Sequence, residues 1–374
     1  MKILYITTLG VAMSHYMSLI EELIAEGNVV DIATNESTSP VPDFYKKLNC
    51  NIYHIDTSRS PISLGNLRAV KQIRKIVQNN GYDIVHCHTP LAAAATRLAC
   101  KKLRKQGKVK VIYTAHGFHF YKGAPLKNWL FFYPVEKLCS RYTDLLITIN
   151  KEDYELAKKK MKAKKVMYVP GVGVEVSKFA AIFVDKKQKR AEIGVPEDAF
   201  MLLSVGELNK NKNHKVVIKA ISQLKDSNIH YVIAGIGKRR DNLQSLASKL
   251  GVNLHLLGFR NDIPYLDKIA DCYVLPSIRE GLNVSVMEAM ASGLVCIVSN
   301  ARGNSELIDK KGGFLCKSSS ANEFAEAIKK VKASNLEEYS SYNLKKIIAF
   351  DKALINAQMR RIYDQVLSSC GQVQ

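Results

Sequence analysis

Strand-like and helix-like segments alternate along this chain, and the alternation is the feature that most limits its possible folds. Residues 2–8 and 29–34 are apolar runs typical of strands, and residues 14–27 between them have the apolar spacing of a helix. Gly27 ends that helix, and a further apolar strand follows at 82–89. Strands that are separated by helices predict a parallel sheet with crossover helices.

The pattern restarts after a loop rich in charged and small residues at about 180–197. A strand at 200–208, a helix at 214–226 and a strand at 229–237 open a second block. The chain has 374 residues, whereas single hydrophobic cores stop growing at roughly 250–300 residues. We therefore predict an α/β protein of two doubly wound, Rossmann-like domains with an interdomain cleft.

The predicted domain limits follow from these two blocks. Residues 1–175 form the N-terminal domain and residues 176–345 the C-terminal domain, with a hinge near 172–180. Residues 346–374 include a helical pattern, which we expect to pack back on the N-terminal domain. In such sheets ligands bind at the carboxyl ends of the strands, where the direction of the crossovers switches.

The formal net charge of +21 is the strongest signal in the composition. Basic clusters lie at 101–110 and 158–165. Such a charge favours nucleic acid, an anionic membrane surface or anionic small molecules, although solvated helix faces also explain it. No zinc-finger, RNP or basic-zipper pattern accompanies the charge, so we predict no nucleic-acid partner.

Targeting signals are weak in this sequence. No apolar run approaches the roughly 20 residues that cross a bilayer, and MKILYITTLG is more typical of a first strand than of a signal peptide. The eight cysteines are scattered without a CxxC motif, a usage typical of reduced thiols. We therefore expect a cytoplasmic protein.

The segment 277–300 (SIREGLNVSVMEAMASGLVCIVSN) follows a predicted strand and has the pattern of a loop and a helix. Asn283 is a candidate N-cap and Gly293 a candidate stop. The unpaired amides of the first helical turn, together with the helix dipole, favour an anion such as a diphosphate.

Two acids, Glu280 in the loop and Glu288 in the second helical turn, lie near the same opening. A carboxylate there can accept two hydrogen bonds from vicinal hydroxyls, as on a ribose or a hexose. The spacing alone is common by chance, and an exposed loop acid and a surface helix acid are the alternative.

The stretch EGLNVSVMEAMASGLVCIVSN…GNSELI resembles the donor-site segment of family 4 glycosyltransferases, which are retaining enzymes of the GT-B fold. Further matches, in the order that this family shows, are VPGVGVEVSKF, VGELNKNKNHKVVIKA, VIAGIG and LGFRNDIPYLDKIADCYVLPS. In the first half, DIVHCHTP and TAHGFHFYKG look like transferases of bacterial exopolysaccharide and capsule loci. The resemblance covers nearly the whole chain and implies an acceptor-side first domain and a nucleotide-sugar-binding second domain.

The resemblance also implies roles for single residues of the second domain. Glu288 matches the acid that holds the donor ribose, and Glu280 matches the acid that meets the sugar hydroxyls near the reacting carbon. Lys212 matches the lysine that neutralises the diphosphate, a role that chemistry also favours for a cation beside a leaving group. The backbone amides of three residues match the diphosphate cradle: Asn283, Val284 and Ser285.

Four further positions are of interest in the light of the resemblance. Arg260 falls where the family contacts the base, mainly through its backbone, and His116 matches a histidine beside the transferred sugar. Gly10 falls in the loop over the donor phosphates. Glu207 stands where the family commonly has an arginine. Because a carboxylate cannot stabilise a diphosphate, we expect Glu207 to orient Lys212 or to meet a hydroxyl.

His86, His88, His116 and His119 have spacings that suit metal ligands. No carboxylate motif accompanies them, and GT-B enzymes need no bound metal for a diphosphate leaving group. We therefore predict no metal and no cofactor, with the nucleotide sugar as a substrate.

Residues 124–142 (APLKNWLFFYPVEKLCSRY) gather the only tryptophan, several other aromatic residues and basic residues. This segment is either an interfacial element that reaches a lipid-linked acceptor or a helix whose aromatic residues fill the core. The net charge favours the membrane surface.

The sequence as a whole predicts a retaining hexosyltransferase, associated with the inner face of the plasma membrane. It would use a nucleotide sugar, with UDP as the expected nucleotide, and a polyprenyl-diphosphate-linked glycan as the acceptor. Two alternatives stay open. One is a nucleotide-sugar epimerase of the same architecture. The other is a non-catalytic partner subunit of another transferase, which the acid at Glu207 favours.

Overall fold

The computed structural model describes residues 1–60 and 63–368. The chain divides into two compact units, each built on its own parallel sheet. Unit 1 comprises Met1–Val172 and the chain from Ile355 onward, and unit 2 comprises Gly173–Leu354. The divisions fall after Val172 and after Leu354, whereas the expected domain limits were residues 175 and 345. The predicted class of two doubly wound parallel α/β domains is confirmed.

The sheet of unit 1 has seven parallel strands in the order β3-β2-β1-β4-β5-β6-β7. Their bounds are β1 Lys2–Leu9, β2 Val29–Asn35, β3 Ile52–His54, β4 Ile84–His88, β5 Lys110–Ala115, β6 Leu145–Thr148 and β7 Lys165–Tyr168. The helices of this unit are η1 Gly10–Tyr16, α1 Met17–Ala25, α2 Phe44–Lys47, α3 Gly65–Asn80, α4 Pro90–Lys105, α5 Leu126–Ser140, α6 Lys151–Lys160 and α16 Lys352–Ser368.

The sheet of unit 2 has six strands in the order β10-β9-β8-β11-β12-β13. Their bounds are β8 Phe200–Val205, β9 Ile229–Ala234, β10 Asn253–Gly258, β11 Cys272–Leu275, β12 Val295–Ser299 and β13 Gly313–Cys316. The helices are α7 Val176–Ala180, α8 Lys186–Glu192, α9 Lys215–Leu224, α10 Arg240–Leu250, α11 Ile263–Ile269, α12 Val284–Ala291, α13 Asn304–Leu307, α14 Ala321–Lys332, α15 Leu336–Ile347 and η2 Ile348–Phe350.

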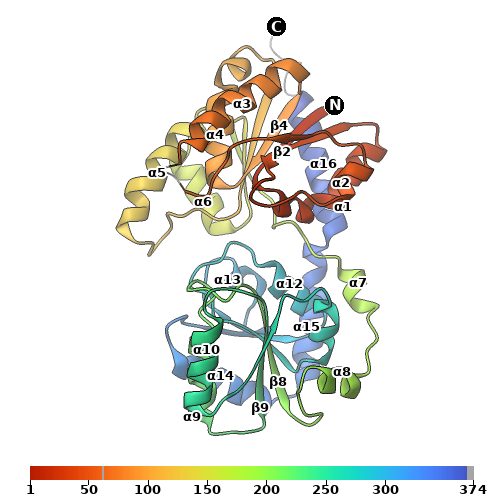
Figure 1. Cartoon of the computed structure of the whole chain (residues 1–374), viewed down its shortest axis with the longest axis vertical. Coiled ribbons are helices and arrows are strands. Elements are labelled where there is room, and N and C mark those ends of the chain that lie inside the picture. Colours follow the sequence, from red (N-terminus) through yellow and green to blue (C-terminus); the bar gives the residue numbers. More distant parts are fainter. Residues whose placement is uncertain (61–62, 369–374) are drawn as a thin grey trace. The chain divides into compact units, whose positions relative to one another are not determined.

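Helices cover both faces of the unit 1 sheet, which explains why its strands are apolar at successive positions. On β1, Leu4 and Ile6 lie in one hydrophobic cluster, while Ile3 and Tyr5 lie in another on the opposite face. The second cluster includes Tyr363 and its neighbours from α16, drawn in blue in Figure 1. The last long helix is therefore part of the core of unit 1.

Helix α5 contains the aromatic segment, and the structure divides its large side chains between two environments. Trp129, Phe132 and Tyr133 are partly buried against the core of unit 1. Leu130 and Phe131 are 64% and 72% exposed. The core interpretation thus holds for one face of the helix, and contact of the exposed face with a membrane stays a prediction. Within residues 1–60 and 63–368, no helix is long and apolar enough to span a bilayer.

A buried ion pair fastens α5 to α4. The Arg97 Nη1 atom donates to Glu136 Oε2 at 2.9 Å, and the two side chains are only 1% and 8% exposed. The Arg97 guanidinium also lies over the ring of Tyr113, 4.3 Å from its centroid. Removing one partner of such a pair leaves the other charge buried without compensation.

We therefore expect Glu136→Ala to lower the free energy of unfolding of unit 1 by about 3–5 kcal/mol. Denaturant unfolding, followed by the fluorescence of Trp129 on the same helix, would measure the change. Asp43→Ala removes an exposed pair with Lys46 and should leave the free energy of unfolding almost unchanged, because solvent screens such a pair. Equal effects of the two substitutions would contradict a structural role for the buried pair.

Candidate functional site

Three of the residues predicted for the donor site, Glu207, Lys212 and Glu280, lie at one edge of the unit 2 sheet. Strands β8 and β11 are neighbours there, although β9 and β10 come between them in the chain. This neighbour pair is the topological switch point, where ligands bind in open α/β sheets. Glu207 and Lys212 follow β8, and Glu280 follows β11. The fold thus brings together residues that lie far apart in the sequence.

Lys212 and Glu280 form a direct ion pair. The Lys212 Nζ atom donates to Glu280 Oε1 at 2.8 Å, and the side chains are 17% and 12% exposed. Gly206 allows the lysine to adopt this position, because a Cβ atom there would lie 3.0 Å from Lys212 Cε and the φ angle is +150°. The sequence pointed to both charged residues but not to their pairing.

Glu207 lies in a short hydrogen-bonded turn with Lys212. Asn209 Nδ2 donates to Glu207 Oε2 at 2.7 Å, and the backbone N–H of Lys212 donates to Asn209 Oδ1 at 2.9 Å. The carboxylate of Glu207 therefore acts on the turn that carries the lysine. This arrangement suits the expectation that Glu207 orients Lys212.

Helix α12 begins with its side-chain cap in place. Asn283 Oδ1 accepts hydrogen bonds from the backbone N–H of Val286 at 3.2 Å and from Ser285 Oγ at 2.7 Å. Tyr273 on β11 in turn donates to Ser285 Oγ at 2.7 Å. The backbone N–H groups of Val284 and Ser285 have no acceptor among the described residues. They are therefore available to an anion, as in the predicted diphosphate cradle.

The loop before α13 contacts the loop that carries Glu280, and the sequence analysis gave it no role. Arg302 Nε donates to the backbone carbonyl of Glu280 at 3.3 Å. A Cβ atom on Gly303 would lie 1.2 Å from the carbonyl oxygen of Gly281, so no larger residue fits there. The only sequence feature that pointed to this loop was GNSELI, residues 303–308, which is part of the match to the donor-site segment.

Glu288 is half-buried on α12. Burial raises the pKa of its carboxyl group to about 7; the nearby charges of Lys178 and Lys352 lower it in part, and Glu175 raises it. No hydrogen bond joins this carboxylate to another residue in the described part of the chain. Both of its oxygens can therefore accept hydrogen bonds from a ligand.

Arg260 has its guanidinium group occupied by acids. Its Nε atom donates to Asp262 Oδ1 at 2.7 Å, and its Nη2 atom donates to Glu192 Oε1 at 2.8 Å. These pairs hold the side chain in place. A contact to a nucleotide base through the backbone of Arg260 is compatible with this arrangement, as expected.

Gly10 lies at the corresponding edge of unit 1, directly after β1. Its backbone N–H donates to the carbonyl of Ser39 at 3.2 Å. A Cβ atom at this position would lie 2.5 Å from both the Ser39 oxygen and the Pro40 carbonyl carbon. Close packing against the loop at Ser39 and Pro40 therefore explains why position 10 is a glycine.

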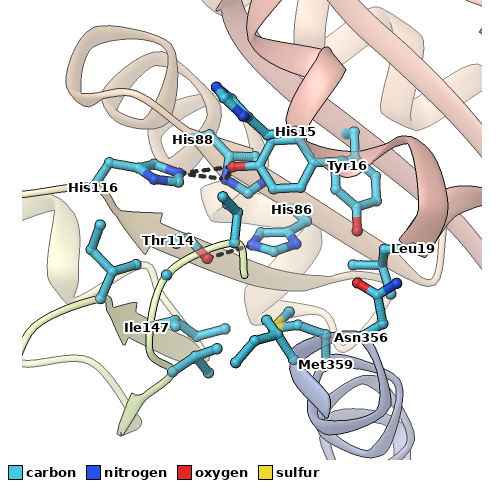
Figure 2. Close-up of a pocket in the computed structure, with 16 residues that line it drawn as sticks. His15, Tyr16, Leu19, His86, His88, Thr114, His116, Ile147, Asn356 and Met359 are labelled. Carbon is cyan, nitrogen blue, oxygen red and sulfur yellow. Dashed lines mark hydrogen bonds between the residues drawn. The ribbon is translucent and has the colours of Figure 1, made fainter. Parts of the chain in front are cut away.

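His116 follows β5 and lines a pocket of unit 1 with Tyr16, His86 and His88 (Figure 2). The Tyr16 hydroxyl lies 2.9 Å from His116 Nε2 and 3.1 Å from His88 Nδ1. Tyr16 ends η1 after β1, and His88 ends β4. The cluster therefore surrounds the switch point of this sheet, between β1 and β4. Sequence reasoning selected His116 and missed Tyr16.

These histidines are neutral near pH 7. Burial lowers the pKa of His116 to about 4, with a further contribution from the charge of His15. Burial, followed by the charges of His86 and His116, lowers the pKa of His88 well below its usual value. His119 lies elsewhere, with its ring stacked on Phe132 at 4.5 Å.

Over the residues that the structure describes, no three His, Cys, Asp or Glu side chains are placed to hold a metal ion. The expectation of a metal-free site stays a prediction.

Comparison with known families identifies the class of protein. Residues 2–150 match the family model described as Glycosyl transferase 4-like, and residues 185–346 match the one described as Glycosyl transferases group 1. EpsD of Bacillus subtilis (strain 168) is 40% identical over 320 residues, which cover 83% of this chain and 84% of that protein. This chain belongs to the same family of glycosyltransferases.

The name of another relative specifies its donor and its acceptor, and solved structures show the same fold. The UDP-Gal:alpha-D-GlcNAc-diphosphoundecaprenol alpha-1,3-galactosyltransferase of Escherichia coli is 29% identical, over 79% of this chain and 78% of that protein. Among solved structures, HepE from Anabaena in complex with UDP has a TM-score of 0.80 at 19% identity, covering 98% of this chain and 100% of that chain. Sucrose-phosphate synthase from Thermosynechococcus elongatus has a TM-score of 0.82 at 19% identity, covering 98% and 99%. The GT-B fold is thereby confirmed.

The raised pKa of Glu288 predicts a pH-dependent stability. The folded chain holds a proton on this group up to a pKa of about 7, whereas the unfolded chain releases it near 4.5. The contribution to stability is therefore complete below pH 4.5 and is lost as the pH rises to 7, by up to about 3 kcal/mol. Glu288→Gln should remove this decline, as measured by unfolding at pH 5 and pH 8. The same decline in wild type and variant would assign it to other groups.

Proposed function

We propose that this glycosyltransferase transfers a hexosyl group from a UDP-sugar to a polyprenyl-diphosphate-linked saccharide, with retention of anomeric configuration. The observation that carries the proposal is the arrangement at the carboxyl edge of the unit 2 sheet. There Lys212 and the free amides of α12 accompany two partly buried acids, Glu280 and Glu288. Each element suits one part of a nucleotide sugar.

Departure of the diphosphate is the step that the protein assists most. The amides of Val284 and Ser285 donate to phosphate oxygens, and the positive end of the α12 dipole adds to their effect. Lys212 neutralises the charge that develops on the leaving group. In the free protein its ammonium group is held by Glu280 at 2.8 Å, so the cation is already in place. This chemistry requires neither a metal nor a cofactor.

The nucleotide is held by Glu288, whose two carboxylate oxygens accept hydrogen bonds from the ribose hydroxyls. Two findings support uridine as the base. HepE was solved with UDP, and the related Escherichia coli enzyme is named for a UDP-galactose donor. The backbone at Arg260 contacts the base, and Glu280 and His116 meet hydroxyls of the transferred sugar.

Retention follows from a displacement on one face of the sugar, assisted by the leaving diphosphate. The acid nearest to the lysine, Glu280, is already engaged by the Lys212 ammonium group. A carboxylate that is neutralised in this way is a poor nucleophile, which argues against a covalent glycosyl intermediate on Glu280.

The acceptor is a lipid-linked saccharide presented at the inner face of the plasma membrane. Relatives from Escherichia coli and Campylobacter jejuni are named for diphospho-undecaprenol acceptors. Helix α5 supports membrane contact, because Leu126, Leu130 and Phe131 are 74%, 64% and 72% exposed. Exposed lysines before and within the first turn of this helix, Lys122 and Lys127, complement anionic headgroups.

The donor site predicts a nucleotide preference that thermal unfolding can measure. UDP at about 100 times its dissociation constant should stabilise the fold by roughly 2.7 kcal/mol, more than GDP or ADP. Glu288→Ala should abolish the shift, because the ribose contacts are lost.

The control variant is Glu326→Ala, which replaces an exposed acid on α14 and should leave the UDP shift unchanged. A UDP shift that persists in Glu288→Ala would contradict the ribose role. No shift with any nucleotide would favour the partner-subunit alternative, in which the acid at Glu207 replaces the usual arginine. If UDP binds, a sugar product isolated on the lipid acceptor would exclude the epimerase.

The exposed face of α5 predicts binding to anionic vesicles. Replacing Leu130 and Phe131 together by serine should weaken binding to phosphatidylglycerol vesicles by about tenfold or more, because apolar surface no longer enters the bilayer. Sedimentation with vesicles would measure the change. Phe183→Ser, at an aromatic residue 92% exposed in unit 2, is the matched control. Equal binding by all three proteins would exclude α5 as the membrane contact.

A further inference from the structure

Three polar atoms form a small triangle in the unit 1 pocket, at the point where Figure 2 shows dashed lines. The Tyr16 hydroxyl oxygen lies 2.9 Å from His116 Nε2 and 3.1 Å from His88 Nδ1. The two ring nitrogens lie 3.2 Å from each other. Tyr16 and His88 are buried, and His116 is half-buried. Water therefore has little access to this triangle.

The triangle restricts where protons can reside. If both His88 Nδ1 and His116 Nε2 carried hydrogen, the two N–H groups would point at each other across 3.2 Å. If neither nitrogen carried hydrogen, their lone pairs would face each other, and the single Tyr16 hydroxyl proton would be the only donor to both. One of the two nitrogens is therefore protonated and the other is not. Both rings are neutral near pH 7, because burial lowers the pKa of each.

The second nitrogen of His88 decides between the two arrangements. His88 Nε2 is buried and has no hydrogen-bond partner among the residues described. If His88 Nδ1 were bare, Nε2 would carry the proton and would be a buried donor without an acceptor. Such orphaned N–H groups are rarer in proteins than unpaired acceptors. The proton of His88 therefore resides on Nδ1.

The remaining hydrogen bonds follow in one direction. His88 Nδ1–H donates to the Tyr16 oxygen, and the Tyr16 hydroxyl donates to His116 Nε2. His116 is then protonated on Nδ1, and no described residue is bonded to that nitrogen. The ring of His88 is itself held in place against that of His86, whose centroid is 4.2 Å away. His86 bonds Tyr363 of α16 at 2.7 Å and Thr114 at 2.8 Å.

We infer that Tyr16 and His88 are positioning residues that hold His116 as the neutral Nδ1–H tautomer. His116 then offers a hydrogen-bond donor to a hydroxyl oxygen of the transferred sugar, and it does not act as a general base through Nδ1. The tautomer follows from the geometry alone, whereas its use toward a sugar rests on the proposed function. The sugar atom that contacts His116 must therefore be an oxygen that accepts a hydrogen bond.

The tautomer can be measured without any substrate. Long-range ¹H–¹⁵N correlation on protein labelled at its histidines, at pH 7, distinguishes the bare nitrogen of each ring, and His116→Gln assigns the signal. We expect the bare nitrogen of His116 to be Nε2 in the wild type. Tyr16→Phe combined with His88→Leu removes the hydroxyl that donates to Nε2 and the ring that orients this hydroxyl, so the signal should move toward a mixture of tautomers. A bare Nδ1 in the wild type, or an unchanged signal in the folded double variant, would overturn the inference.

Transfer assays supply the second readout. Tyr16→Phe should lower kcat by about tenfold, the effect of one lost hydrogen bond, and should change KM less than twofold or so. His116→Asn can place an amide N–H near the former Nδ1 position and should retain more activity than His116→Gln, which cannot. The reverse order would overturn the donor role. A confirmed tautomer in a protein that transfers no sugar would instead contradict the proposed function. Thermal unfolding of Tyr16→Phe checks that the hydroxyl is not needed for folding.

Discussion

The pairing of β8 with β11 is the constraint on which the candidate donor site depends. These strands are joined in parallel, with Leu202 opposite Cys272 and Leu203 opposite Tyr273. Parallel register brings both carboxyl ends to one edge, so the loops after them meet there. The chain departs from β8 in one direction across the sheet and from β11 in the other, which leaves the edge between them open. A lysine from one loop and an acid from the other can then form a pair across this switch point.

That pair sets the electrostatic character of the edge. An ammonium group 2.8 Å from a carboxylate is neutral as a unit, so the free protein does not bury an isolated charge. An incoming diphosphate changes the balance, because it brings its own negative charge toward Lys212 and the α12 amides. The Lys212 ammonium group has three N–H donors, so under the proposed function it binds a phosphate oxygen while Glu280 Oε1 stays bonded to it, and Glu280 Oε2 accepts from a sugar hydroxyl. The acid can therefore contact the lysine and a hydroxyl at the same time, as the role proposed for it requires.

Local pattern was enough to predict the alternation of strands and long helices, because both have a short-range periodicity. The cap at Asn283 was predictable for the same reason, since capping depends on residues within one helical turn. Local pattern was wrong for α8, Lys186–Glu192, which lies in the stretch expected to be a loop. Contacts between distant loops were not predictable in this way. The Lys212–Glu280 pair joins residues 68 positions apart, and nothing in either local stretch encodes the other. On α5, the adjacent residues Phe131 and Phe132 differ in burial because of core packing that the aromatic composition does not specify.

In unit 1, as in unit 2, side chains from two neighbouring strands meet at the switch point of the sheet, but those of unit 1 are neutral. Its switch point lies between β1 and β4, and Tyr16 and His88 converge there from the loop after one strand and the end of the other. Burial removes the positive charge from the histidines, so their interaction is governed by proton placement and not by attraction between ions. The hydrogen bonds of the triangle fix the tautomer of His116 before any ligand binds. The N–H donor of His116 is therefore already in place and needs no reorganisation when a ligand binds. Under the proposed function, the edge of unit 2 binds an anion and His116 of unit 1 supplies a directional hydrogen-bond donor.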